Sequence, residues 1–260
     1  MTPTKSRMSQ KQRIEAIRRQ LLQFDEVSVK DMAKQFNVSD MTVRRDLDLM
    51  QSRGEIIHTH GGAALAKRLT FEFAFRDRQN RNQELKEAIA KQAIEHVSDG
   101  DTVMLDTGTT TLAIAKALAG TRSVTIITTS LAIISQVQFA DNIEVILLGG
   151  FLRGGSPDVH GPLTEQNIDY FKTDVAFMGA DAVDSDGVTY AQDLRIVNLD
   201  RKMALNTEKV IVAADSAKFG KTAMCRVLEP GEYTRILTTA DLDEGILAGL
   251  HEKNIKVELC

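Results

Sequence analysis

The 260-residue sequence predicts an α/β main domain with a parallel sheet, preceded by a small N-terminal winged helix-turn-helix domain. Three observations predict this class. Apolar residues recur at helical spacing in the first 52 residues, short apolar strands alternate with helices from residue 85 onward, and the charge changes sign between the two parts. We therefore expect the winged helix-turn-helix domain at 8–62, a linker at 63–84 and the α/β domain at 85–260.

The first two helices are indicated by apolar spacing and by a capping signal. Ile14, Ile17 and Leu21 recur at i, i+3 and i+7, which places them on one buried stripe of a helix. Ser28 is expected to begin the second helix as its N-cap, and Asp31 completes an S-x-x-D capping box. The second helix is expected to bury four residues: Val29, Met32, Ala33 and Phe36.

The third helix, expected over residues 40–51, has an apolar side and a polar side. Val43, Leu47 and Met50 fall within about 60° of one another on a helix, so they face the core. The opposite side suits a DNA groove, because Arg pairs with guanine edges or phosphates and Thr with a base edge or a thymine methyl group. With the N-cap serine, the candidate DNA contacts are Ser39, Met41, Thr42, Arg44 and Arg45.

A short hairpin follows the third helix and completes a winged helix-turn-helix. Residues 55–60 predict a strand that turns at Gly61 and Gly62. Paired glycines let the backbone of such a wing approach DNA closely. His58 and His60 lie two residues apart and point to one face of the strand. Because no Cys or third His stands nearby, we interpret both as facing DNA rather than a metal ion.

The charge distribution favours a polyanion as the partner of the first domain. Residues 1–68 carry 13 Lys and Arg against 8 Asp and Glu, whereas residues 69–260 carry 19 against 28. A basic first domain on an acidic body is typical of proteins whose first domain alone meets nucleic acid. One alternative is that the third helix is an ordinary surface helix of a bundle, and another is that the first domain is a protein-interaction module. Changing Arg44 and Arg45 to Ala separates the protein-interaction hypothesis from DNA binding.

Composition indicates a soluble protein in a reducing compartment. No apolar run approaches the roughly 20 residues that span a bilayer, and the polar, basic N-terminal residues do not resemble a secretory signal. The two cysteines, Cys225 and Cys260, have neither metal nor redox spacing. We therefore expect a cytoplasmic protein that needs no membrane, no metal ion and no other cofactor.

The second domain alternates predicted helices with buried strands. The linker carries Phe71, Phe73 and Phe75, which we expect to pack on the body or on a partner subunit. Such alternation predicts a parallel sheet, whose ligands bind beyond the carboxyl ends of the strands. Strands are expected at 102–105, 124–127, 143–148, 175–178, 210–212, 235–237 and 255–259.

Threonines, glycines and charged residues follow these strands and are expected to converge on one edge of the sheet. After the first strand, hydroxyl and backbone N–H groups at a helix N-terminus form an anion cradle, although neither a nucleotide P-loop nor a G-x-G-x-x-G motif is present. Cations suit a phosphate and carboxylates suit hydroxyl groups, which favours a phosphorylated polyol. The alternative is that residues 106–111 only cap a helix. The candidate residues are Asp106, Thr107, Gly108, Thr109, Thr110, Thr111, Thr129, Gly149, Gly150, Arg153, Asp181 and Lys218.

Taken together, these motifs resemble the DeoR family of bacterial sugar-metabolism repressors over essentially the whole chain. Two positions depart from the family pattern: Thr129 stands where Asn is usual, and His58 stands near the place of a wing arginine. The resemblance rests on Ser39-x-x-Thr42-Val43-Arg44-Arg45-Asp46-Leu47, Gly54, His60-Gly61-Gly62-Ala63, DTGTTT at 106–111, Thr128-Thr129-Ser130, Gly149-Gly150, Gly179-Ala180-Asp181, Asp186-Gly187 and Asp215-Ser216-x-Lys218-Phe219-Gly220.

The resemblance implies that the second domain is a sensor similar to ribose-5-phosphate isomerase. Residues 106–111 would hold the phosphate of a sugar effector, with Asp181 and Lys218 near its hydroxyl groups. An isomerase of that type needs a second acidic residue ahead of G-A-D, where this chain has Met178, although Asp193 and Asp200 are candidates to compensate.

We therefore expect a non-enzymatic transcriptional regulator that represses a carbohydrate-metabolism operon. Its partners would be double-stranded operator DNA and a phosphorylated sugar effector, and the assembly a homodimer or homotetramer that matches a repeated operator. The alternative function is a sugar-phosphate isomerase with an accessory DNA-binding domain.

Overall fold

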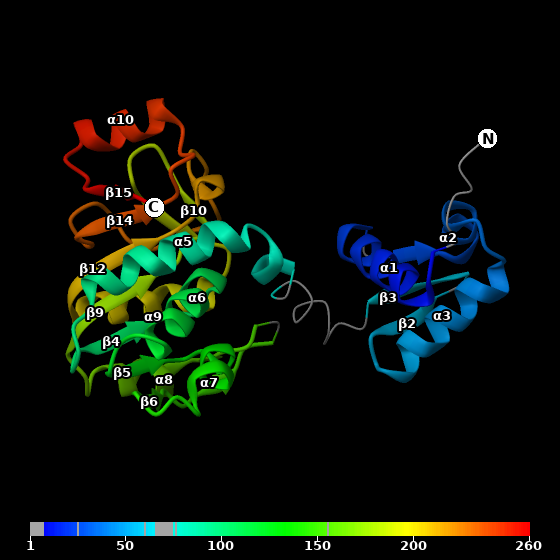
Figure 1. The fold of residues 1–260 in the computed structure, drawn as a ribbon, viewed down its shortest axis with the longest axis horizontal. Coiled ribbons are helices and arrows are strands. Elements are labelled where there is room, and N and C mark those ends of the chain that lie inside the picture. Colours follow the sequence, from blue (N-terminus) through cyan, green and yellow to red (C-terminus); the bar gives the residue numbers. More distant parts are fainter. Residues whose placement is uncertain (1–7, 25, 60, 66–74, 76, 155) are drawn as a thin grey trace. The chain divides into compact units, whose positions relative to one another are not determined.

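The computed structural model describes residues 8–24, 26–59, 61–65, 75, 77–154 and 156–260 (Figure 1). The chain divides into two compact units, Met1–Asp77 and Arg78–Cys260, which we call the head and the body. The division falls inside the segment that we expected to be a linker. Phe75 is buried, whereas Phe71 and Phe73 lie outside the described residues.

The head contains the three predicted helices: α1 Gln10–Phe24, α2 Val29–Phe36 and α3 Asp40–Ser52. Their apolar stripes meet in one core, in which Ile17, Leu21, Val43, Leu47 and Met50 are fully buried, as their spacing predicts. This core explains why three short helices are stable together, since each contributes an apolar face that only the others cover.

The start of α2 differs from the prediction. Ser28 occupies the N-cap position, but its side chain accepts no capping hydrogen bond, so the expected capping box with Asp31 is not formed. The reason is that Ser28 also ends a strand, β1 Glu26–Ser28, which pairs with the wing. Ser39, by contrast, caps α3 as predicted, because its Oγ accepts a hydrogen bond from the Thr42 N–H at 3.2 Å.

The wing is a three-stranded antiparallel sheet in the order β1-β3-β2, with β2 at Ile56–Thr59 and β3 at Gly62–Leu65. Thr59 of β2 pairs with Gly62 of β3, so β3 begins one residue earlier than predicted, and Gly61 has a φ of +98°. Gly62 already belongs to β3 and pairs with Ser28. A Cβ atom at Gly62 would lie 1.9 Å from the Val27 carbonyl oxygen, so only glycine fits there.

The described residues of the body form a seven-stranded sheet in the order β15-β14-β12-β9-β4-β5-β6, with every neighbouring pair parallel. All seven strands coincide with the predicted apolar segments. Their bounds are β4 Thr102–Leu105, β5 Val124–Thr128, β6 Ile143–Leu147, β9 Thr173–Met178, β12 Thr207–Ala213, β14 Arg235–Thr238 and β15 Val257–Leu259.

The strand order reverses between β4 and β9. From β4 the chain continues through β5 to the edge strand β6, and then returns to the other side of β4 as β9 before continuing to β12, β14 and β15. The loops after β4 and β9 therefore leave the sheet in opposite directions. In open parallel sheets, such a switch point opens a crevice at the carboxyl ends of the strands.

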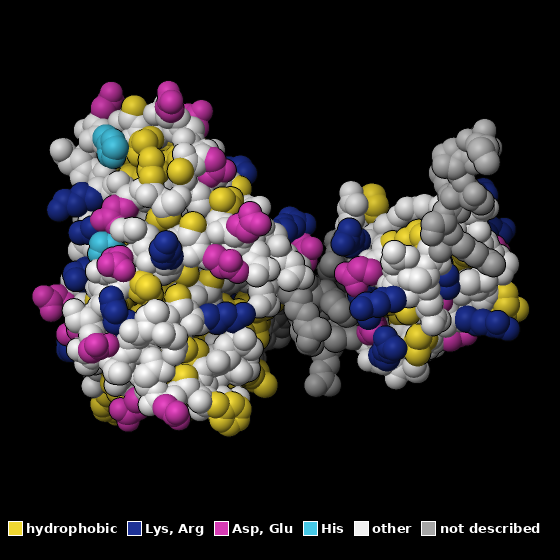
Figure 2. Space-filling model, viewed as in Figure 1, with side chains coloured by type: hydrophobic (Ala, Val, Ile, Leu, Met, Phe, Trp, Pro, Cys, Tyr) yellow, Lys and Arg dark blue, Asp and Glu magenta, His cyan; other side chains and the backbone are white. Residues whose placement is uncertain are grey.

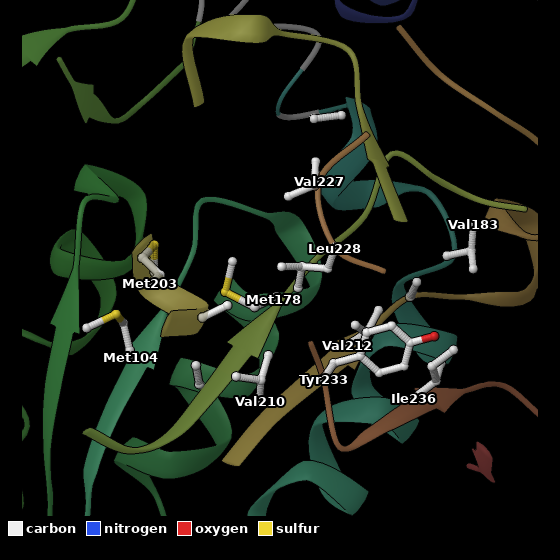
Figure 3. Close-up of a cluster of buried hydrophobic side chains, with 14 of the residues drawn as sticks. Met104, Met178, Val183, Met203, Val210, Val212, Val227, Leu228, Tyr233 and Ile236 are labelled. Atoms are coloured by element: carbon white, nitrogen blue, oxygen red, sulfur yellow. The ribbon is translucent and has the colours of Figure 1, made fainter. Parts of the chain in front are cut away.

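Six α-helices of seven to twelve residues accompany the sheet in the described part of the body. Helix α6 packs against both α5 and α7, whereas α8 packs against α9 (Figure 1). On the α9 side, a cluster of buried side chains joins Met104 and Met178 of the sheet to Met203 of α9 (Figure 3). The helices are α5 Gln83–Ala93, α6 Thr109–Ala119, α7 Leu131–Val137, α8 Pro162–Ile168, α9 Leu194–Leu205 and α10 Glu244–Glu252.

Two small sheets were not predicted, because strands of two or three residues leave no readable alternation. One pairs β7 Phe151–Leu152 with β8 Val159–His160, and the other has the order β10-β11-β13, at Ala182–Val183, Thr189–Ala191 and Cys225–Arg226. Within the described residues, no helix combines the length and the apolar character needed to cross a membrane.

Candidate functional site

The free side of α3 presents the side chains expected to meet DNA. Met41 is 60% exposed, and Arg44 and Arg45 are exposed and form no ion pair with any described residue. Thr42 is only half-exposed, because its hydroxyl oxygen lies 3.0 Å from the Oγ of the capping Ser39. The helix therefore offers two unpaired guanidinium groups and a flexible apolar side chain to a ligand.

Helix α3 is held in place by a buried ion pair that sequence patterning did not reveal. Asp46 is 1% exposed, and its carboxylate accepts hydrogen bonds from Arg13 Nε at 2.7 Å and Gln10 Nε2 at 3.0 Å. A second pair joins Arg18 of α1 to Glu55 at the start of the wing at 2.7 Å. Helix α1 thus holds both α3 and the start of the wing in place.

The wing residues have different surroundings. His58 Nε2 lies 3.2 Å from the Asp48 carboxylate of α3, and His60 lies outside the described residues. Gly61 is exposed at the turn, whereas Gly62 is buried against β1. Of the two predicted wing glycines, only Gly61 is therefore exposed at the turn, because strand packing takes up the space beside Gly62. The described residues hold no group of three or more His, Cys, Asp or Glu side chains placed to hold a metal ion.

The body has a pocket of about 380 Å³ at the carboxyl ends of β4, β9 and β12, where the strand order reverses. These three strands are neighbours in the sheet, so the segments that follow them meet in space. Asp106 and Asp215, which both line the pocket, are 109 positions apart in the sequence. The predicted residues that line the pocket are Asp106, Thr107, Gly108, Thr109, Thr110, Asp181 and Lys218.

The other five predicted residues lie outside the pocket lining. Thr111 is fully buried, and its Oγ1 accepts the Gly108 N–H at 3.0 Å, which shapes the start of α6. Thr129 is 2% exposed and its Oγ1 lies 3.1 Å from Thr107 Oγ1, so it supports a lining residue from behind.

Arg153, Gly149 and Gly150 do not line this pocket, and the sheet order explains their position. They follow β6, which is the edge strand and lies two strands away from β4. Arg153 is bound by Asp158 at 2.6 Å and Asp193 at 3.0 Å, so its guanidinium is already neutralised. Gly150 packs against α8, where a Cβ atom would lie 1.9 Å from Thr164 Oγ1.

Several lining residues were not among the predicted site residues. Arg78, Arg81, Asn82 and Lys86 come from the segment that enters α5, and Lys221, Asp200 and Asp215 from the far side of the pocket. One signal was available in the sequence: Lys86 lies on the same helical stripe as Ile89, Ala90 and Ala93, and all four are buried. A lysine on an apolar stripe is uncommon unless a partner holds it.

Asp106 lies at the base of the pocket in an unusual state. Its Oδ2 accepts the Gly179 N–H at 2.6 Å, whereas Oδ1 is buried without a hydrogen-bond partner among the described residues. Burial raises the pKa of Asp106 to about 6, and the nearby Asp181 adds to the increase. Burial also raises the pKa of Asp200 well above its ordinary value, with a further contribution from Asp106. Both carboxyl groups are therefore protonated at a higher pH than an exposed aspartate would be.

The Asp106 shift predicts how the stability of the body depends on pH. The folded pKa of about 6 exceeds the reference value of 3.8, so the folded state binds the proton more tightly. The stabilisation that this proton gives the folded state is fully present below pH 3.8 and is lost as the pH rises through 6. The loss lowers the free energy of unfolding by about 3 kcal/mol. We expect the free energy of unfolding of the wild type to fall by this amount relative to Asp106→Asn between pH 3 and pH 7.

Urea denaturation of both proteins at several pH values measures this difference. Asp141→Asn, at an exposed position, controls for the substitution itself. Because Asp106 contributes to the raised pKa of Asp200, the difference between the two proteins reports on Asp106 together with its effect on Asp200. A difference that does not change with pH would contradict the assigned state of Asp106.

Comparisons with known proteins agree with both units. The model of the DeoR-like helix-turn-helix domain matches residues 13–68, and that of the DeoR C terminal sensor domain matches residues 81–240. The chain belongs to the DeoR family. It is accordingly a transcriptional regulator with a DNA-binding helix-turn-helix domain and a sensor domain, as the sequence motifs predicted.

Relatives of this DeoR-family chain span nearly its whole length. It is 31% identical to the glycerol-3-phosphate regulon repressor of Escherichia coli (strain K12), over 97% of this chain and 100% of that protein. It is 28% identical to a putative aga operon transcriptional repressor of Escherichia coli O157:H7, over 95% and 93% of the two chains. It is 30% identical to the regulator GolR of Listeria innocua, over 91% and 93%.

Solved structures with a similar fold are more distant. Ribose 5-phosphate isomerase A from Methanocaldococcus jannaschii matches with a TM-score of 0.40 and 21% identity, over 53% of this chain and 55% of that one. The translation initiation factor eIF-2B of Pyrococcus horikoshii OT3 matches with a TM-score of 0.44 and 17% identity, over 87% and 86%.

Proposed function

We propose that the body binds a phosphorylated sugar or polyol, and that this effector controls the binding of the head to operator DNA. The observation that carries the proposal is the pocket itself. One cavity combines a helix N-terminus with a cation and a buried carboxyl oxygen that have no partner among the residues that the structure describes. The named relatives that repress glycerol-3-phosphate and aga genes are consistent with an effector of this class.

The phosphate would lie at the start of α6. The first residues of α6 line the pocket together with Thr107, and Thr107, Thr109 and Thr110 each carry a hydroxyl group. The N-terminus of a helix attracts an anion through its backbone N–H groups and through the helix dipole. Lys218 is half-buried, and its Nζ forms no hydrogen bond or ion pair with the described residues, so it can approach the same anion.

The pocket as a whole carries an excess of positive charge. Five cations line it among the described residues against four carboxyl groups, of which Asp106 and Asp200 have raised pKa values. By contrast, positive and negative side chains are interspersed on the face of the body in Figure 2. The pocket cations are Arg78, Arg81, Lys86, Lys218 and Lys221, and the carboxyl groups are those of Asp106, Asp181, Asp200 and Asp215.

The hydroxyl groups of the effector would lie against the carboxyl groups. Asp106 Oδ1 is buried and has no hydrogen-bond partner in the described part of the chain, which costs free energy that a ligand hydroxyl would recover. Asp181 also faces the pocket, with its Oδ2 held by the Gln192 N–H at 2.8 Å. A phosphate at one end and hydroxyl groups at the other distinguish a sugar phosphate from inorganic phosphate.

We propose that the protein acts as a homodimer or homotetramer and represses a carbohydrate operon. Two or more heads on a repeated operator give affinity that a single head of this size lacks. An effector that favours one arrangement of subunits would shift the population toward or away from the arrangement that fits the half-site spacing.

A thermal-shift screen of the full chain tests the effector proposal. We expect one or more of glycerol 3-phosphate, ribose 5-phosphate, fructose 6-phosphate and fructose 1,6-bisphosphate to raise the Tm, because a ligand of the folded state stabilises it. Inorganic phosphate should act more weakly, and Lys218→Gln should reduce the shift. If no member of the panel changes either the Tm or operator binding, the proposal is wrong for these sugars.

The alternative function, a sugar-phosphate isomerase, has less support in the site. Met178 stands where a second acid would be needed, and its side chain is buried in the core beside Met104 (Figure 3). Asp193 is bound by Arg195 and Arg153, which lower its pKa, and it does not line the pocket. Incubation with ribose 5-phosphate decides this point, since formation of ribulose 5-phosphate that Asp106→Asn abolishes would favour the enzyme.

A further inference from the structure

One wall of the pocket is made by the residues that connect the head to the body. Arg78 is the first residue of the body, and Arg78, Arg81, Asn82 and Lys86 all line the pocket. The opposite walls come from loops at the ends of β4, β9 and β12, which belong to the rigid sheet. A molecule in the pocket would therefore touch both the sheet and the chain segment that leads back to the head.

Lys86 fastens this segment to α5. The lysine is 5% exposed, and its Nζ donates hydrogen bonds to the backbone carbonyl oxygens of Arg78 and Arg81. Burial lowers the pKa of Lys86, and the positive charges of Lys218 and Arg78 act in the same direction. The cations on this side of the pocket therefore repel one another, and an anion among them would relieve the repulsion.

Arg78 bridges from this segment to the sheet. Its Nη1 lies 3.8 Å from Asp181 Oδ1 at the end of β9, and the two side chains are 49% and 29% exposed. At this distance the two groups form an ion pair without a hydrogen bond. Exposed pairs of this kind contribute little, so a ligand can replace the contact at small cost.

We propose that Arg78 contacts the effector. We further propose that DNA binding by the head changes when Arg78 exchanges its contact with Asp181 for a contact with the effector. This inference rests on the proposed function of the pocket. A phosphorylated sugar offers Arg78 a charge-assisted hydrogen bond in place of the longer ion pair, while its hydroxyl groups donate hydrogen bonds to the Asp181 carboxylate. Residues 78–82 then shift relative to the sheet, and this segment is continuous with the linker to the head.

The test compares variants that break the ion pair from either side. Arg78→Gln and Asp181→Asn each remove one charge at a half-exposed position. Lys91→Gln, at an exposed position on α5, is a control of equal charge change outside the pocket. Affinity is measured by fluorescence anisotropy with a DNA duplex that the wild-type full chain has selected from a random pool, first without any sugar phosphate.

Without a sugar phosphate, we expect Arg78→Gln and Asp181→Asn to shift DNA affinity by about two- to fivefold in the same direction, as expected for the loss of an exposed ion pair. Lys91→Gln should bind as the wild type does. If both pair variants also bind DNA as the wild type does, the coupling through Arg78 is overturned.

The sugar phosphates of the screening panel supply the second measurement. For any panel member that raises the wild-type Tm, Arg78→Gln should weaken its binding at least tenfold in calorimetry, since a charge-assisted hydrogen bond is lost. Unchanged binding would overturn the effector contact. A DNA shift in both pair variants, with no panel member binding the wild type, would reject the proposed effector class and leave the Arg78 coupling in place.

Discussion

Changing Arg44 and Arg45 together to Ala is expected to lower the affinity for the selected operator duplex by about 10²- to 10³-fold. Both side chains are exposed on α3 and have no ion-pair partner among the described residues, so they are available to DNA. Each arginine that reads a guanine edge contributes about 1–3 kcal/mol, and a phosphate contact adds to binding through counterion release. The fold should be unaffected, because neither side chain contributes to the head core.

The single variants Arg44→Ala and Arg45→Ala assign the role of each arginine through the salt dependence of their DNA affinity. A residue that contacts a phosphate lowers the slope of log affinity against log salt by about 1 when it is removed, whereas a residue that reads a base relaxes sequence preference instead. Arg19→Ala, an exposed arginine on α1, is the matched control. If the double variant bound operator DNA as tightly as the wild type, the free side of α3 would not be the recognition surface.

The second large effect is expected for Asp46→Ala, which should unfold the head. Asp46 is almost completely buried and accepts hydrogen bonds from Arg13 and Gln10. Its removal leaves the buried Arg13 guanidinium without a counterion, which costs about 3–5 kcal/mol. That is close to the whole stability of a domain of this size. Operator binding should be lost, although Asp46 itself cannot reach DNA.

Hydrogen exchange measured by mass spectrometry separates loss of fold from loss of contact. Peptides from α1 and α3 should lose protection in Asp46→Ala, while peptides from the body serve as an internal control. Asp48→Ala removes an exposed acid two residues away on the same helix and should change stability by about 0.5 kcal/mol or less.

A double variant, Arg13→Met with Asp46→Leu, should recover most of the protection, because a buried pair can be replaced by apolar side chains of similar size. Full protection in Asp46→Ala would show that the buried pair is dispensable for the head.

Local patterns in the sequence were sufficient to predict several features of the fold. The spacing of Val43, Leu47 and Met50 identified the buried side of α3, and therefore also the side that Arg44 and Arg45 present to solvent. The seven apolar segments of the body all became strands of one parallel sheet. These features depend on residues that are near one another in the chain, where periodicity and burial are directly related.

Features that depend on distant pairs could not be predicted in this way. Arg153 follows a strand in the same manner as Lys218, yet β6 is the edge strand, so only Lys218 lines the pocket. Gly62 resembles a wing-tip glycine, yet β1 packs against it and buries it. In each case the deciding fact is which strand lies beside which, and a single sequence does not encode that relation in any local pattern.

The sequence by itself therefore determined the two-domain organisation, the recognition helix with its exposed arginines, and the family to which the chain belongs. The tertiary structure alone decided which residues form the pocket, and it brought Arg78 and Lys86 from the segment before α5 to face Asp181 after β9. The physical reason is that helical and strand periodicity act over a few residues, whereas the pocket depends on a sheet order that contacts between residues far apart in the chain establish.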